Sequence, residues 1–230
     1  MHSYFSRAAC IACISCLALG TTAISLANVL VNPGFETGAV FGAAPVAGAF
    51  GWDRAGTAET ASINGDPAHS GMGSLKMTSS FNLDVPNVFQ AFAASPGQTW
   101  DFQGYMLAPG AIAGATFGLL KIVWSDGTND LATGVIHIGL DDPSVFPGID
   151  AQPFLDLHST PGEWQFAQAQ GVAPAGTTEV KFFALYVGLS DVPSVAYFDD
   201  LQASRIPEPG SLALLLAGML ALPLVRKRRA

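Results

Sequence analysis

Residues 178–204, TEVKFFALYVGLSDVPSVAYFDDLQAS, decide the fold class of this chain. They contain two stretches rich in β-branched and aromatic residues, Thr178–Val187 and Val195–Ser204, with glycine, aspartate and proline between them. This pattern is typical of two β-strands joined by a loop. No convincing amphipathic helix competes with it.

The same pattern recurs on the N-terminal side of this region. The further stretches are Asn28–Val31, Ser74–Ser80, Asn87–Ala93, Gln98–Leu107, Thr116–Trp124, Gly134–Leu140 and Glu163–Ala169. About nine strands with long connections predict an all-β protein, an antiparallel β-sandwich that is most simply a jelly roll. The poorly patterned segments Ala43–Ala49 and Asp141–Asp156 are expected to be loops.

The N-terminus has the features of a signal peptide. Arg7 precedes an apolar stretch, Ala8–Ala23, and Ser25-Leu26-Ala27 places small residues where a signal peptidase cleaves. We expect residues 1–27 to be removed, so that the mature chain starts at Asn28. All three cysteines of the protein lie in this segment. The mature domain therefore has no disulfide, and its stability must come from core burial, bound metal or both.

The C-terminus resembles the PEP-CTERM sorting signal of Gram-negative bacteria. Pro207, Glu208 and Pro209 precede a 14-residue apolar run, 212–225, and then a basic end, 226–230. The resemblance implies transient insertion into the inner membrane, recognition by an exosortase-type membrane protease, and transfer of the folded part to the cell surface or medium. The apolar run corresponds to about 21 Å of helix, short for a hydrocarbon core of about 30 Å. A plain single-pass anchor is the alternative.

Charge excludes one class of partner. The span 28–206 contains five basic and 17 acidic residues, a formal charge of −12. Such a surface repels phosphate backbones, so we expect no nucleic-acid binding. Divalent cations are more natural partners.

Short motifs along residues 28–204 carry a second resemblance. In order, they are NPGFE at 32–36, GW at 51–52, HSG at 69–71, PGQTW at 96–100, EW at 163–164, PAG at 174–176 and YFDDL at 197–201. They are similar to the carbohydrate-binding modules with a galactose-binding-like jelly roll that accompany many secreted glycosidases. The resemblance implies one β-sandwich domain over residues 28–204, followed by a linker with the sorting motif, 205–211.

The same resemblance implies a structural calcium ion that ties the first strand to the last. Its expected ligands are Glu36 and Asp200, with Asp199 as a further candidate. Strand alternation would place only one of the two neighbouring acids on the site. The alternative is that Lys76 or Arg54 pairs with these acids and no metal is bound.

Glycan binding would require exposed aromatic rings, and Trp124, Tyr105 and Tyr186 are the candidate platform residues. Catalysis is poorly supported, because the chain has no G-x-S-x-G motif and the histidines of the mature span are widely separated. We therefore expect an exported, non-catalytic protein that associates with envelope or matrix polysaccharide. The alternative is a structural surface or matrix protein that binds no glycan.

Overall fold

The computed structural model describes residues 27–36, 52–56, 61–64, 67–112, 116–132, 135–138 and 160–207. The predicted signal peptide up to residue 26, Glu208 and Pro209 of the predicted sorting motif, and the apolar run 212–225 lie outside these ranges. Within the described ranges, no helix is long and apolar enough to cross a membrane.

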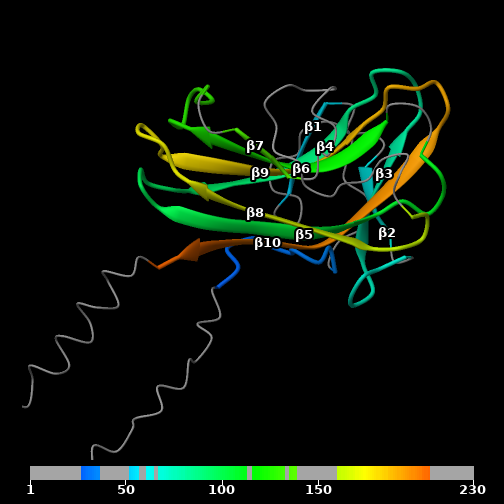
Figure 1. The fold of residues 1–230 in the computed structure, drawn as a ribbon, viewed down its shortest axis with the longest axis horizontal. Coiled ribbons are helices and arrows are strands. Elements are labelled where there is room, and N and C mark those ends of the chain that lie inside the picture. Colours follow the sequence, from blue (N-terminus) through cyan, green and yellow to red (C-terminus); the bar gives the residue numbers. More distant parts are fainter. Residues whose placement is uncertain are drawn as a thin grey trace, which may run out of the picture.

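The described residues form ten strands in two antiparallel sheets, packed as two layers (Figure 1). The first sheet has the order β1 (Asp53–Gly56), β4 (Pro86–Ala93), β9 (Glu179–Val187), β6 (Phe117–Ser125) and β7 (Ile136–Ile138). The second sheet has the order β2 (Ala61–Asn64), β3 (Ser74–Ser79), β10 (Ser194–Ile206), β5 (Thr99–Leu107) and β8 (Gln165–Val172). The predicted all-β antiparallel sandwich is confirmed.

Most predicted strands agree with observed ones, and the differences lie at the edges. β1 and β2 were not predicted, since DRAG and ASIN lack an apolar alternation. Asn28–Val31 is not a strand, although the Val29 N–H donates to the Ala203 carbonyl at 2.9 Å. β10 continues to Ile206, two residues beyond the predicted domain end.

The core lies between the sheets and follows from alternation along the central strands. On β9, Val180, Phe182, Ala184 and Tyr186 are buried, and the residues between them are partly exposed. From the opposite layer Phe102 packs on Phe182, with ring centres 5.4 Å apart. Each large side chain buried in this way contributes about 1.5–3 kcal/mol.

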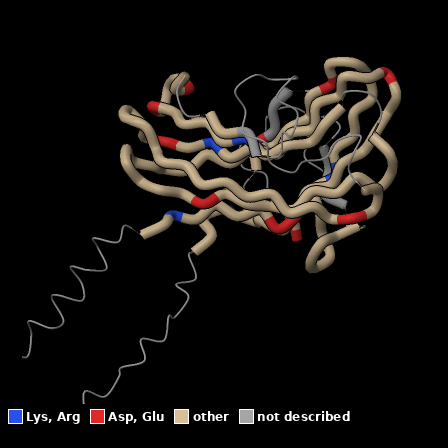
Figure 2. Tube along the Cα trace, in the orientation of Figure 1, with Lys and Arg blue, Asp and Glu red and all other residues tan. Residues whose placement is uncertain are grey.

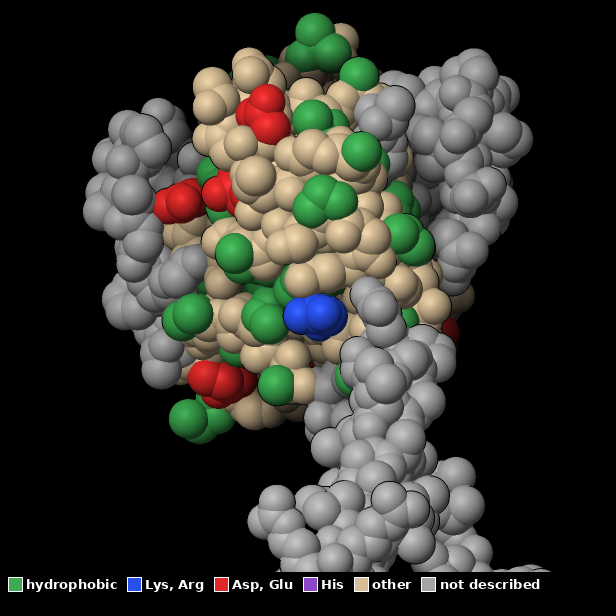
Figure 3. Space-filling model, turned by 90° about the vertical axis from the view of Figure 1, so that its left-hand side faces the viewer, with side chains coloured by type: hydrophobic (Ala, Val, Ile, Leu, Met, Phe, Trp, Pro, Cys, Tyr) green, Lys and Arg blue, Asp and Glu red, His purple; other side chains and the backbone are tan. Residues whose placement is uncertain are grey.

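Charge is distributed unevenly over this scaffold. Acidic residues occur in both layers and in the loops, and basic residues are few (Figure 2). On the end of the sandwich at which β10 finishes, hydrophobic side chains are scattered among polar ones and do not gather into one patch (Figure 3).

Candidate functional site

A β-bulge in β10 brings two adjacent carboxylates to the same loop. The pairing of β10 with β5 shifts between Asp199 and Gln202, and Asp200 has a φ of 48°. Aspartate tolerates this left-handed conformation better than most residues. The extra residue keeps both Phe198 and Leu201 in the core. The expectation that only one of the two acids would face the site therefore does not hold.

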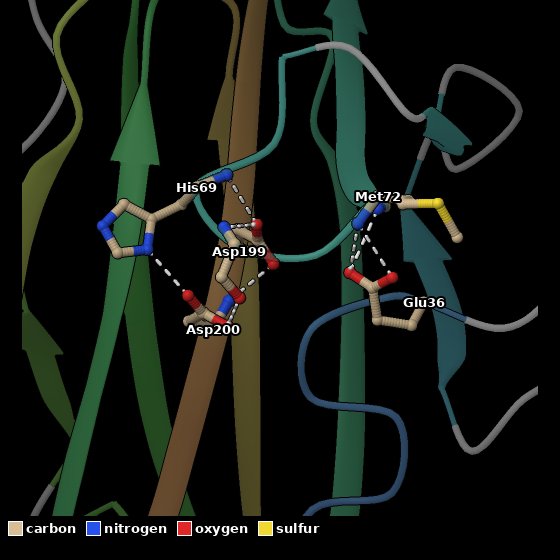
Figure 4. Close-up of polar contacts among 7 residues, drawn as sticks. Glu36, His69, Met72, Asp199 and Asp200 are labelled. Carbon is tan, nitrogen blue, oxygen red and sulfur yellow. Dashed lines mark hydrogen bonds and ion pairs between the residues drawn. The ribbon is translucent and has the colours of Figure 1, made fainter.

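The two acids bind the same two residues before β3 (Figure 4). Asp199 Oδ2 accepts hydrogen bonds from the backbone N–H groups of His69 at 2.8 Å and Ser70 at 3.2 Å. Asp200 Oδ2 lies 2.7 Å from Nδ1 of the His69 ring, and Asp200 Oδ1 accepts from the Ser70 hydroxyl at 2.8 Å. Both carboxylates thus fix the start of one loop.

Glu36 holds the next part of that loop. Its Oε1 accepts from the backbone N–H groups of Met72 and Gly73, each at 3.0 Å. Gly73 leaves no room for a side chain, because a Cβ there would collide with the carbonyl oxygen of Phe35. The loop is therefore clasped between the NPGFE segment and the bulge of β10.

Burial changes the acid–base behaviour of one of these groups. The Asp199 side chain is fully buried. Loss of solvation raises its pKa from 3.8 to about 6, although backbone donors at Ser70, Asp200 and His69 favour the charged form. The negative charge of Asp200 raises the pKa further.

The donor chemistry of this region fits calcium in part. Within the described ranges, no three His, Cys, Asp or Glu side chains are close enough to hold a metal ion together. Glu36 and the aspartates instead contact successive residues of one loop, so backbone carbonyls would have to supply further oxygens. A buried carboxylate with a raised pKa would gain from a nearby cation. The Lys76 side chain makes no ion pair with these acids in the described part of the chain, and that of Arg54 lies outside it.

Two of the three predicted platform residues are core residues. Trp124 and Tyr186 are both fully buried, so neither can stack on a ligand. The Trp124 ring packs edge-on against Phe102, with centres 6.0 Å apart. The Tyr186 hydroxyl donates to the Ser194 hydroxyl at 2.7 Å, and burial raises the pKa of Tyr186. Alternation could not assign these residues to a face without knowing which side of each strand is packed.

Tyr105 lies on the outer face of β5 and belongs to a group of rings. His69 stacks on it with ring centres 3.6 Å apart, and Trp164 meets His69 edge-on at 5.5 Å. Phe166 on β8 lies 5.2 Å from Tyr105 and is 42% exposed. Of this cluster, only Tyr105 is among the predicted platform residues. The sequence does not show that the rings of His69, Trp164 and Phe166 lie beside it.

A second set of residues crosses the outer face of the first sheet. In register, Asp53 on β1 is opposite Phe89 on β4, Phe89 is opposite Phe183 on β9, and Phe183 is opposite Lys121 on β6. The two phenylalanine rings stack at 4.8 Å, and Lys121 Nζ lies 5.9 Å from the centre of the Phe183 ring. All four side chains are partly exposed. The sequence signal for this row was the presence of apolar residues at three outward positions of β9, Phe183, Leu185 and Val187.

One polar atom beside this row lacks a hydrogen bond. Asn87 on β4 is opposite Leu185 on β9. Its side chain is 7% exposed, and its Oδ1 atom has no hydrogen-bond partner in the described structure. Buried acceptors are usually satisfied by protein, water or a ligand.

Comparison with known proteins supports the fold. No model of a protein family matches the chain, and no curated protein matches its sequence. Among solved structures, a family 61 carbohydrate-binding module in complex with β-1,4-galactotriose is 16% identical, with a TM-score of 0.49 over 78% of this chain and 99% of that one. The enzymatically active domain of tailspike protein 4 of bacteriophage CBA120 is 15% identical, with a TM-score of 0.51 over 78% of this chain and 21% of that one. An arabinose-bound α-L-arabinofuranosidase is 12% identical, with a TM-score of 0.54 over 78% of this chain and 27% of that one. At these identities the likeness to the tailspike domain and to the arabinofuranosidase shows a shared sandwich fold and nothing more.

Proposed function

We propose that this chain is an exported, non-catalytic protein that binds envelope or matrix polysaccharide through the outer face of the first sheet. The observation that carries the proposal is the stacked pair Phe89 and Phe183 beside Lys121, all three partly exposed at the centre of that face.

The chemistry of this face suits a sugar chain. The apolar side of a pyranose stacks on an aromatic ring, and its hydroxyls need donors and acceptors at the edge of the ring. The partly exposed Lys121 supplies donors, and the partly exposed Asp53 carboxylate supplies acceptors. Polar and aromatic groups are therefore interleaved as a glycan site requires.

Binding can be tested with the full-length chain in mild detergent on immobilised exopolysaccharide from its host. Phe183→Ala should lower the affinity about fivefold, since an aromatic contact contributes roughly 0.5–1.5 kcal/mol. Lys121→Gln should also weaken retention. Phe81→Ala is a matched control, because Phe81 is an exposed phenylalanine in the loop between β3 and β4.

Unchanged retention of both variants, with unchanged melting temperatures, would refute this face as the site. If the unsubstituted chain is not retained either, the structural role without glycan binding becomes the better account.

We propose in addition that calcium binds where Glu36, Asp199 and Asp200 hold the loop 69–73. The support is the convergence of three acids on one loop and the buried state of the Asp199 carboxylate. The ion would fasten the NPGFE segment to β10 and offset the repulsion between neighbouring acids.

The ends of the chain support a proposal about location. We propose that residues 1–27 direct export, and that an exosortase-type protease removes the tail after the Pro207-Glu208-Pro209 motif. Mass spectrometry of the extracellular protein from its host should show the loss of residues 212–230. An intact tail on that protein would exclude this processing.

A further inference from the structure

The outer face of β8, β5 and β10 is built in rows that are set by strand register. Phe166 on β8 is opposite Tyr105 on β5. In the next row, Gln168 on β8 is opposite Gln103 on β5, which is opposite Gln202 on β10. An aromatic row is therefore followed by an amide row about 7 Å further along the strands.

The rings of the aromatic row are accessible to solvent and are held in place by neighbouring side chains. Phe166 is 42% exposed, and Tyr105 next to it is partly exposed. The His69 ring, stacked on Tyr105 at 3.6 Å, is held in turn by the Asp200 carboxylate at 2.7 Å. Rings fixed in this way lose little conformational freedom when a flat ligand stacks on them.

The amide rows offer both donors and acceptors. Gln103 Nε2 donates to Gln202 Oε1 at 2.7 Å, and Gln168 Nε2 donates to Asp101 Oδ1 at 2.8 Å. Gln170, one row further, is exposed and has no side-chain hydrogen bond to any described residue. These groups match the alternating donor and acceptor roles of sugar hydroxyls.

We infer that this face is a second glycan-binding site, separate from the one on the first sheet, and that it takes an uncharged polysaccharide. The preference follows from charge: among the described residues no lysine or arginine occupies these rows, and the carboxylates Asp101 and Asp200 border them. Lys76 faces outward on the same sheet, but it lies on β3, which β10 separates from β5. A uronate chain in these rows would meet two anions with no cation in the same rows to offset them. The opposite face differs, because it carries Lys121.

The two faces belong to opposite layers of the sandwich (Figure 1). One molecule can therefore hold two glycan chains at once, and a matrix built from such contacts gains avidity from many weak sites. The second site rests on its own residues and does not depend on the site proposed for the first sheet.

The test is affinity electrophoresis of the full-length chain, in mild detergent, through gels that contain matched neutral and acidic polymers. Hydroxyethylcellulose is paired with carboxymethylcellulose, and β-1,4-galactan with polygalacturonate. Phe166→Ala and Gln168→Ala should each weaken binding of a neutral polymer about fivefold. Phe183→Ala should leave measurable binding of that polymer. The double variant with both Phe166→Ala and Phe183→Ala should lose this remaining binding. Phe81→Ala should migrate like the unsubstituted chain.

Each of the other possible results either refutes or supports a part of this proposal. If Phe183→Ala alone abolishes all binding, or if no neutral polymer binds, the second site is refuted. If Phe166→Ala weakens binding of an acidic polymer as much as that of its neutral partner, the preference for uncharged chains is refuted. An effect of Phe166→Ala without any effect of Phe183→Ala supports the second site and removes the first. Melting temperatures distinguish a local loss from unfolding, and Gln168→Ala removes no core contact, because Gln168 is exposed.

Discussion

Asp199 makes the stability of the metal-free protein depend on pH. Its pKa is about 6 in the folded chain and near 3.8 when unfolded, so the folded state binds the proton more tightly. The resulting stabilisation is complete below the unfolded pKa and is lost as pH rises through about 6. With excess chelator, unfolding in urea should require about 1 kcal/mol less at pH 7.5 than at pH 5.

Two comparisons isolate this carboxylate from other titrating groups. Asp199→Asn, which cannot ionise, should have a flatter profile between these pH values. Added calcium should reverse the trend if the ion binds there, because a cation favours the ionised form. A profile of Asp199→Asn that parallels the unsubstituted chain would assign the pH dependence elsewhere.

The stability losses on truncating Trp124 and Tyr105 should reflect how deeply each ring is buried. Trp124→Ala should lower the free energy of unfolding by about 3–5 kcal/mol, since it leaves a large cavity between the sheets. Tyr105→Ala, in a partly exposed ring, should lower it by about 1 kcal/mol. Urea unfolding followed by circular dichroism measures both values, and a larger effect for Tyr105 would contradict the packing described here.

The sequence does not reveal which face of each strand is packed against the opposite sheet. The sequence indicated that Glu36 and the acids of β10 belong together, and in the structure all three contact the loop 69–73. It could not assign Trp124 and Tyr186 to the core, because period-two alternation fixes relative faces and not which of them is buried. The pairing of His69 with Asp200 spans 131 positions, which no local pattern encodes.

At the scale of elements, the loop before β3 depends on close backbone contact. Gly73→Ala should destabilise the protein by about 2–3 kcal/mol, because its Cβ would meet a backbone carbonyl that cannot rotate away. Gly110→Ala is the matched control, since a Cβ there meets no atom within 4 Å and Gly110 does not have a positive φ. Thermal melting of both variants measures the difference, and equal midpoints would mean that the loop moves freely away from Phe35.

The long central strands were predictable, and the short edge strands β1 and β2 were not. β9 and β5 have many β-branched and aromatic residues, which a pleated, half-buried surface favours. β1 and β2 have four residues each and pair through the backbone of one neighbour, so side-chain pattern contributes little to their position. The bulge in β10 breaks the alternation that strand prediction relies on.

At the scale of the whole molecule, β10 contacts the first described segment of the chain and also forms the last strand. Near its bulge, the Leu201 N–H donates to the Pro33 carbonyl at 3.0 Å, and the Asn28 amide donates to the Leu201 carbonyl at 2.9 Å. Its last residues lead to Pro207, about 26 Å beyond Asp199 at the rise of an extended strand. The aromatic cluster around Tyr105 is therefore separated from the point at which the chain leaves the sandwich.

Calcium bound between Glu36 and the bulge would stabilise the fold as a whole, because it would join the first segment, the loop before β3 and the last strand. A ligand that binds only the folded state at 100 times its Kd adds about 2.7 kcal/mol, which corresponds to roughly 5–10 °C in Tm for a domain of this size. We expect that shift in Tm when the full-length chain in excess chelator receives millimolar calcium.

Glu36→Gln should abolish most of the calcium-induced shift, whereas Glu179→Gln, at the far end of β9, should keep it. Magnesium should have a smaller effect, since it demands a tighter octahedral shell than one loop with its carboxylates provides. If calcium leaves the Tm unchanged, the acids are satisfied by the backbone N–H groups alone, and the clasp around residues 69–73 holds without a metal.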